Sequence, residues 1–140
     1  RIDTILGSAL GFEHYFASTF MANPEINIQN NSSQDSYYKN FSYGPSLLLD
    51  WTPNDFWELY ASTSYTYTNY AGRYVSTVVR GRTTSSKEYQ ELTSTDVGVV
   101  YTFENNISLQ LKYSIAKNSS NNTTSSYKAN VISYNIGLRF

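Results

Sequence analysis

The sequence contains no cysteine among its 140 residues, which excludes a disulfide framework and a thiolate metal site. Ten Lys and Arg residues nearly balance eleven Asp and Glu residues, which leaves no basic footprint for nucleic acid and no acidic tail. No run approaches the about eighteen apolar residues that a membrane-spanning helix needs, and no signal-peptide pattern is present. Because the chain opens on Arg1 and not on Met, we expect it to begin at an internal or processed position.

Aromatic residues are abundant in contrast, with 14 Tyr, 7 Phe and 2 Trp, yet the mean hydropathy is -0.45. A soluble core rarely needs that much Tyr with so little Leu, Ile and Val. The wall of a transmembrane barrel does, because alternate residues face lipid and an aqueous lumen, and the average is then polar. The composition is therefore compatible with a membrane protein.

Alternation of apolar and polar residues at period two is the dominant pattern. The clearest runs cover residues 107–116 and 127–140, and similar runs cover residues 41–51, 57–67 and 89–103. Period-two alternation indicates strands with one apolar face. Residues 2–12 and 15–28 are expected to add two strands, although Pro24 interrupts the second, for a total of seven.

The connections between these strands alternate in length. Residues 51–56 and 103–107 form short turns built from Pro, Asn and Asp. Residues 27–36, 69–87 and 117–126 are long and rich in Asn, Ser and Thr. Residues 74–80 and 87–92 could prolong their hairpin beyond a membrane, with Gly81 near its tip. Short turns on one side and long polar loops on the other are typical of a transmembrane barrel.

Three further features favour a membrane over a soluble antiparallel sandwich. The alternate positions that form the apolar face of each strand carry almost no charge. The strands are also longer than is typical of soluble domains. Aromatic residues also gather at the strand ends, where they predict two belts about 25 Å apart. Trp51, Trp57, Tyr101 and Phe103 lie beside the short turns, and Tyr65, Tyr67 and Tyr89 lie toward the long loops. The sequence thus predicts an all-β, antiparallel up-and-down transmembrane β-barrel.

Five charged residues fall on the polar parity of their strands: Asp50, Glu58, Asp96, Lys112 and Arg139. In a pore these charges would bias ion passage, whereas in a narrow barrel they would pair and plug the interior. For a small barrel the plugged interior is favoured. We expect at least one carboxylate to lie close to Arg139 or Lys112.

The last segment alternates Tyr134, Ile136 and Leu138 and ends on Phe140, and it resembles the C-terminal assembly signal of bacterial outer-membrane β-barrels of the porin-like family. The resemblance implies an outer-membrane location, with the short turns and the C-terminus in the periplasm and the long loops extracellular. It also implies recognition by the barrel-assembly machinery. More loosely, residues 101–140 are similar to the ends of porin-like barrels, including some that serve secretion systems.

Three functions follow as hypotheses. The first is a porin-like channel or the conduit of an export system, and the second is a closed barrel that anchors or scaffolds an envelope complex. The third is a soluble β-sandwich that binds ligands through its loops. No enzyme, cofactor or metal site is expected, because the single histidine, His14, belongs to no catalytic motif with Ser8 or Ser18.

Residues 1–140 are expected to form one barrel segment, the C-terminal portion of a larger barrel. Seven strands place the two ends of the chain on opposite sides of the membrane, whereas bacterial single-chain barrels have even strand numbers. An open sheet would also expose unpaired backbone groups to lipid. We therefore expect at least one further strand, from a preceding segment or from another chain.

Overall fold

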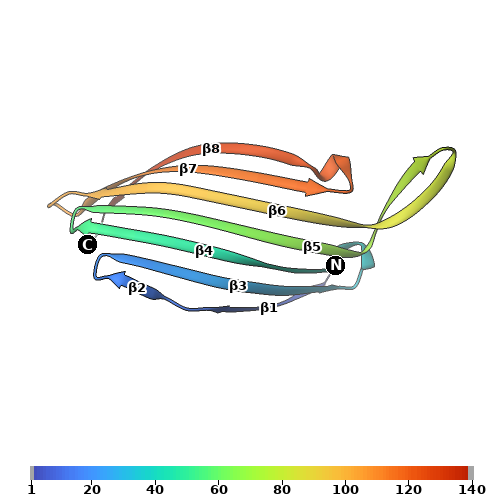
Figure 1. The fold of residues 1–140 in the computed structure, drawn as a ribbon, viewed down its shortest axis with the longest axis horizontal. Helices are drawn as coiled ribbons and strands as arrows, with labels where there is room; N and C mark the ends of the chain where they lie inside the picture. Colours follow the sequence, from blue (N-terminus) through green and yellow to red (C-terminus); the bar gives the residue numbers. More distant parts are fainter. Residues whose placement is uncertain (1, 139–140) are drawn as a thin grey trace.

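The computed structural model describes residues 2–138, and these form one antiparallel sheet (Figure 1). The strands are β1 (Asp3–Gly11), β2 (His14–Ala17), β3 (Phe20–Ser33), β4 (Asn40–Asn54), β5 (Trp57–Val79), β6 (Arg82–Thr102), β7 (Ile107–Ser120) and β8 (Tyr127–Leu138). Two short 3-10 helices, η1 (Ser36–Tyr38) and η2 (Thr123–Ser125), lie in connections. The predicted all-β, up-and-down architecture is confirmed.

The strands follow one another across the sheet in the order β1-β3-β4-β5-β6-β7-β8, with β2 also paired to β3. β1 and β8 are the two edges, and within the described residues they do not pair with each other. The sheet therefore does not close on itself. Both edge strands run in the same direction, because β1 and β8 occupy the first and last of seven antiparallel positions, an odd number.

The two ends of the sheet differ in their connections. At one end, which we call the turn end, the chain reverses at residues 18–19, 55–56 and 103–106. At the other, the loop end, lie η1, η2 and the tip of the β5–β6 hairpin, which projects beyond the other strands (Figure 1). Arg80 and Gly81 form this tip, with φ of 51° and 77°. Positive φ at both central residues suits a two-residue hairpin turn, as expected from Gly81.

The prediction of a single strand over residues 15–28 is wrong. The chain reverses at Ser18 and Thr19, so that Tyr15 lies opposite Met21 and His14 opposite Ala22. β2 therefore continues the position of β1, and eight strand segments occupy seven positions in the sheet. The dipeptide Ser-Thr carries neither the glycine nor the asparagine that marks a tight hairpin, which is why the sequence pattern did not reveal it.

Pro24 accounts for the gap between β1 and β2. The backbone N–H of Phe12 donates to the carbonyl of Pro24 at 3.2 Å. Pro24 has no N–H to donate in return, so the ladder loses a hydrogen bond at this point. The edge strand is interrupted there, at Phe12 and Glu13.

Several strands extend farther than predicted at the loop end. β3 reaches Ser33, inside the predicted loop 27–36, and β7 reaches Ser120, inside the predicted loop 117–126. Asn, Ser and Thr side chains in these stretches weaken the sequence signal for a strand, but pairing with a neighbouring strand satisfies the backbone groups. The connections are correspondingly short.

The register aligns the alternating positions of neighbouring strands, so that apolar positions lie opposite apolar positions and polar positions opposite polar ones. Leu49, Ala61, Val97, Tyr113 and Ile132 lie opposite one another in one row across β4 to β8. The adjacent row contains Asp50, Tyr60, Gly98, Lys112 and Ser133. Directly paired residues share a face, so the sheet has an apolar face, which contains the first row, and a polar face, which contains the second.

The two faces differ in exposure. Ala22 is the one buried hydrophobic residue among those described, whereas Ile132, Tyr134 and Ile136 on the apolar face are 71%, 81% and 73% exposed. On the polar face Gly98 and Asn118 are buried. The more sheltered polar face indicates that the sheet curves toward it, so that the polar face is the concave one. No helix among residues 2–138 is long and apolar enough to cross a membrane.

Candidate functional site

The polar face is the candidate functional surface, and its middle rows are built mainly of small side chains. The strands β4, β5 and β6 contribute Ser42, Gly44, Ser46, Ser62, Ser64, Ser94 and Gly98, and β7 and β8 add Ser108, Ser114, Ala116, Ala129 and Ser133. Side chains of this size cannot fill the space on the concave side of a broad sheet. The surface is therefore suited to line a water-filled space.

The structure places four of the five predicted lumenal charges on this face: Asp50, Glu58, Asp96 and Lys112. Asp50 and Lys112 share a row but are separated by β5 and β6, which corresponds to about 14 Å. Asp96 lies opposite Ser114, diagonal to Lys112. Within residues 2–138 no ion pair of 4.0 Å or less joins these four side chains.

Arg139, the fifth predicted lumenal charge, lies outside the described residues. The expectation that a carboxylate lies close to Arg139 or Lys112 thus stays a prediction for Arg139. For Lys112, no carboxylate oxygen of residues 2–138 lies within 4.0 Å of the ammonium group, although Asp96 is its diagonal neighbour.

A hydrogen-bonded chain crosses the polar face near its centre. Tyr60 lies directly over Gly98, which has no side chain to displace it. The Gln110 amide donates to the Tyr60 hydroxyl at 2.8 Å, and the Asn135 amide donates to the Gln110 carbonyl at 3.0 Å. The sequence analysis missed this chain, although a Tyr on a polar parity is a signal that could have indicated it.

A pocket of about 580 Å³ opens at the turn end. Glu58 and Ser108 line it from the polar face, and Thr52, Asp55 and Phe56 line it from the neighbouring turn. This pocket is the entrance to the polar face from the turn end. Its carboxylates make that entrance acidic.

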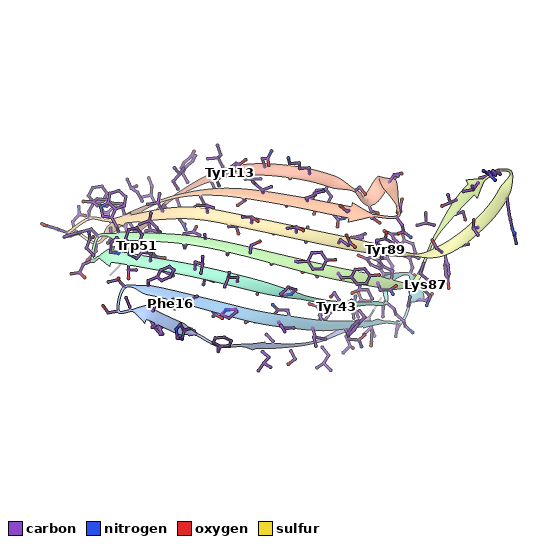
Figure 2. All side chains as sticks on the ribbon, in the orientation of Figure 1. Phe16, Tyr43, Trp51, Lys87, Tyr89 and Tyr113 are labelled. Atoms are coloured by element: carbon purple, nitrogen blue, oxygen red, sulfur yellow. The ribbon has the colours of Figure 1, made fainter. Side chains whose placement is uncertain are left out.

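Aromatic side chains on the apolar face gather in two bands. At the turn end the rings of Trp57 and Tyr101 lie 4.7 Å apart, and those of Tyr101 and Phe103 also lie 4.7 Å apart. At the loop end the Tyr67 ring lies 5.6 Å from Tyr43 and 5.9 Å from Tyr89. Tyr65 shares this face with Tyr67, and Figure 2 shows Trp51 at one end and Tyr43 and Tyr89 at the other.

The spacing of the two bands can be compared with the height of a lipid-facing belt. Tyr67 follows Trp57 by ten residues on β5, which is about 33 Å along the strand. With the strand tilt of about 40° found in outer-membrane barrels, this length spans about 25 Å of height, the height of their apolar band.

A second polar cluster, which the sequence analysis did not identify, lies at the loop end around Glu88. This side chain is 4% exposed and accepts hydrogen bonds from Gln90 at 2.9 Å, Ser125 at 2.9 Å and Asn122 at 3.4 Å. Burial raises the pKa of Glu88, but these three hydrogen bonds and the charge of Arg73 outweigh burial, so the pKa is lowered overall. The carboxylate therefore stays ionised and ties β6 to the η2 connection.

Arg73 joins the same cluster to the η1 connection. Its guanidinium lies 3.9 Å from a Glu88 oxygen, and its Nε donates to the Tyr37 carbonyl at 3.1 Å. The guanidinium also stacks over the rings of Tyr70 and Tyr37, with 3.9 and 4.6 Å to their centroids. Arg73 and Glu88 thus hold three connections together at the loop end. A role in ordering these connections explains the cluster fully.

The residues of the predicted assembly signal lie on the edge strand. Tyr134, Ile136 and Leu138 belong to β8, on the apolar face, and all three are exposed. Phe140 lies outside the described residues. An exposed, alternating edge strand is accessible to another strand or another protein.

No arrangement for catalysis surrounds His14. Its ring packs edge-on against Phe16, 4.5 Å between centroids, on the apolar side of β2. Among residues 2–138 no hydrogen bond joins it to Ser8 or Ser18, and no group of three His, Asp or Glu side chains could hold a metal ion.

The geometry thus consists of a sheet with an open polar face, an uncovered apolar face between two aromatic bands, and connections tied together at one end. Such an arrangement can separate an apolar from an aqueous environment. No protein-family model, curated protein or solved structure matches this chain.

Proposed function

We propose that the chain forms part of the wall of a transmembrane β-barrel in a bacterial outer membrane, and that this barrel is a porin-like channel or the conduit of an export system. The observation that supports the proposal is the inverted distribution of side chains. Large apolar side chains stand uncovered on the more exposed face, and small polar side chains occupy the more sheltered face.

This inversion is unfavourable in water and favourable in lipid. Each Å² of apolar surface left in water costs about 25 cal/mol relative to its burial, and monomeric soluble proteins rarely expose large apolar patches. The apolar face extends across all seven positions of the sheet. Lipid acyl chains would cover it without a second protein layer, which a soluble sandwich would require.

The small side chains of the polar face favour an open channel over a closed anchor. A closed barrel of about eight strands is filled by its inward side chains. Here Ser, Gly and Ala occupy most of the central polar positions, and Tyr60 is the largest side chain of the Asp50 row. The seven positions are also not closed, which is compatible with a barrel of more strands and a wider lumen.

Conductance across a planar lipid bilayer tests the proposal. We expect the full-length protein, refolded from denaturant into detergent and added to the bilayer, to give stepwise current increases. Heat-unfolded protein from the same preparation is the control. Insertion without conductance would favour the closed anchor, and a folded protein that stays soluble without detergent would favour the sandwich.

We further propose that the alternating segment ending at Phe140 is read by the barrel-assembly machinery. Deletion of Phe140 should lower the amount of folded barrel in outer membranes, and should change the unfolding midpoint of purified, refolded protein much less. Heat-dependent gel migration of membrane fractions measures the first quantity. Normal amounts of folded barrel in cells that produce the truncated chain would contradict the proposal.

A further inference from the structure

Two lysines line a groove on the apolar side of the sheet at its loop end. The groove measures about 330 Å³, and Lys39, Lys87, Asn30, Asn69 and Phe41 are among its lining residues. No carboxylate lines it. Both lysines are exposed, and within residues 2–138 neither ammonium group lies within 4.0 Å of a carboxylate. The groove therefore presents two unpaired positive charges beside amide donors.

Two more lysines face each other on the same side of the sheet. Lys117 on β7 lies directly opposite Lys128 on β8, in the row that contains Thr93. Like charges in directly opposed positions destabilise a sheet. The one carboxylate on the described strands of this face is Glu91, in the next row toward the loops. An external anion between Lys117 and Lys128 would relieve their repulsion.

These four lysines, Lys39, Lys87, Lys117 and Lys128, form what we call the basic rim, and it lies at the height of the loop-end aromatic band. Phe41 of the groove has its ring 6.0 Å from Tyr43. Figure 2 shows Lys87 beside Tyr89 and near Tyr43, at the end that carries the projecting hairpin. Tyr residues in such bands prefer the headgroup zone of a bilayer, and lysine side chains near the ends of spanning elements extend to the same zone.

We infer that the basic rim binds the phosphate groups of lipid headgroups in the leaflet at the loop end. A phosphate in the groove would lie between the ammonium groups of Lys39 and Lys87, and the amides of Asn30 and Asn69 could donate to its oxygens. Phe41 would contact the apolar part of the same lipid. This inference rests on the proposed function, because it requires the apolar face to be in a membrane.

Binding of phosphatidylglycerol, compared with neutral phosphatidylcholine, tests the inference. Protein folded in a neutral detergent is titrated with each lipid, and native mass spectrometry measures the two dissociation constants. We expect a preference for phosphatidylglycerol, since each lysine near an anionic lipid surface contributes about fivefold to affinity. The double variant Lys39→Gln/Lys87→Gln should therefore bind phosphatidylglycerol about twenty-five-fold more weakly.

Two control variants distinguish the loss of positive charge in the groove from a general effect of substitution on folding. Lys112→Gln removes a lysine from the polar face and should leave the preference intact. Lys39→Arg/Lys87→Arg keeps both positive charges and should retain phosphatidylglycerol binding. An undiminished preference in the Gln double variant, or no preference in the unaltered chain, would overturn the inference.

An arm with inorganic phosphate distinguishes the lipid from a free anion. If inorganic phosphate displaces phosphatidylglycerol at equal concentration, the groove is a general anion site and the lipid assignment fails. A protein that inserts into bilayers and conducts but shows no preference for phosphatidylglycerol refutes this inference alone. A protein that never enters lipid refutes the proposed function as well.

Discussion

Leu111 and Ser114 lie three residues apart on β7 but on opposite faces, and they provide a direct test of which face contacts lipid. Leu111 shares the apolar face with Tyr134, whereas Ser114 lies opposite Asp96 on the polar face. Leu111→Lys should destabilise the folded protein by about 1–2 kcal/mol, because Leu111 lies one row inside the turn-end aromatic band, where an ammonium group is poorly solvated but not as deep as the midplane. The free energy of unfolding in liposomes, measured with urea, checks this value.

Ser114→Lys is the matched control, since the new lysine would lie on the polar face, directly opposite Asp96. We expect it to change the free energy of unfolding by much less than Leu111→Lys. If the two variants are equally destabilised, the assignment of the apolar face to lipid is wrong.

Single residues also account for features that alternation alone does not explain. Tyr60 stands on the polar parity, where the pattern predicts small or charged residues, because Gly98 opposite leaves room for its ring. Its hydroxyl then accepts from Gln110, so the aromatic ring is held flat against the sheet.

Among the elements, β4 shows how one glycine sets the approach of two strands. A Cβ on Gly44 would collide with the backbone carbonyl of Tyr65, and the next residue, Pro45, has no N–H to donate to β5. Gly44→Ala should therefore destabilise the protein by at least about 2 kcal/mol, because the obstacle is backbone and cannot rotate away. Urea unfolding in detergent micelles measures the loss.

Gly7→Ala provides the comparison for Gly44→Ala. The nearest atom to a Cβ on Gly7 is the Ile28 carbonyl oxygen at 3.5 Å, an ordinary contact distance. This variant should be close to neutral. A Gly44→Ala protein as stable as Gly7→Ala would show that β4 and β5 separate readily at this point.

The connections at the loop end should loosen in acid, because Glu88 holds them only while it is ionised. The pKa of Glu88 is lowered in the folded protein, where three hydrogen bonds and Arg73 outweigh the effect of burial. A group with a lowered folded-state pKa contributes stability that is present above the ordinary glutamate pKa and is lost as the pH falls through the folded-state value. The hydrogen-exchange protection factors of residues 121–126, which correct for the intrinsic effect of pH on amide exchange, should therefore fall below about pH 4.

The Glu88→Gln variant tests the assignment to this one carboxylate. The protection factors of its residues 121–126 should be lower than those of the unaltered protein at neutral pH, and acid should lower them little further. An unaltered pH dependence in Glu88→Gln would assign the effect to another group.

At the scale of the whole molecule, the charges of the polar face predict which ions pass. Glu25, Asp50, Glu58 and Asp96 lie on this face, against Lys112 among the described strand residues at the same levels. A lumen with this excess of carboxylates attracts cations and repels anions. We expect the reversal potential in a KCl gradient to indicate preference for K⁺, more strongly at low ionic strength.

The triple variant Asp50→Asn/Glu58→Gln/Asp96→Asn should shift the reversal potential toward zero without abolishing conductance. Glu104→Gln changes an exposed carboxylate in the turn 103–106 and should leave the potential unchanged. A preference for Cl⁻ in the unaltered channel would contradict the placement of these charges in the lumen.

The central and C-terminal strands could be predicted from sequence because the parity of a strand is a local property. Leu109, Leu111 and Tyr113 alternate with Gln110 and Lys112, and no long-range contact is needed to read that pattern. The hairpin tip at Gly81 was predictable for the same reason, since glycine adopts a positive φ readily whatever its tertiary surroundings. The all-β, antiparallel fold and the common face of Asp50, Glu58, Asp96 and Lys112 followed from such local signals.

Only the tertiary structure decided features that depend on register between distant residues. The reversal at Ser18 and Thr19 is visible because Tyr15 pairs with Met21, and the break in the edge strand because Phe12 pairs with Pro24. The Arg73–Glu88 cluster brings together residues of β5 and β6, and the groove of Lys39 and Lys87 brings together the η1 connection and β6. The alternation within one strand contains no information about which residue stands beside which across the sheet, and that pairing places these side chains together.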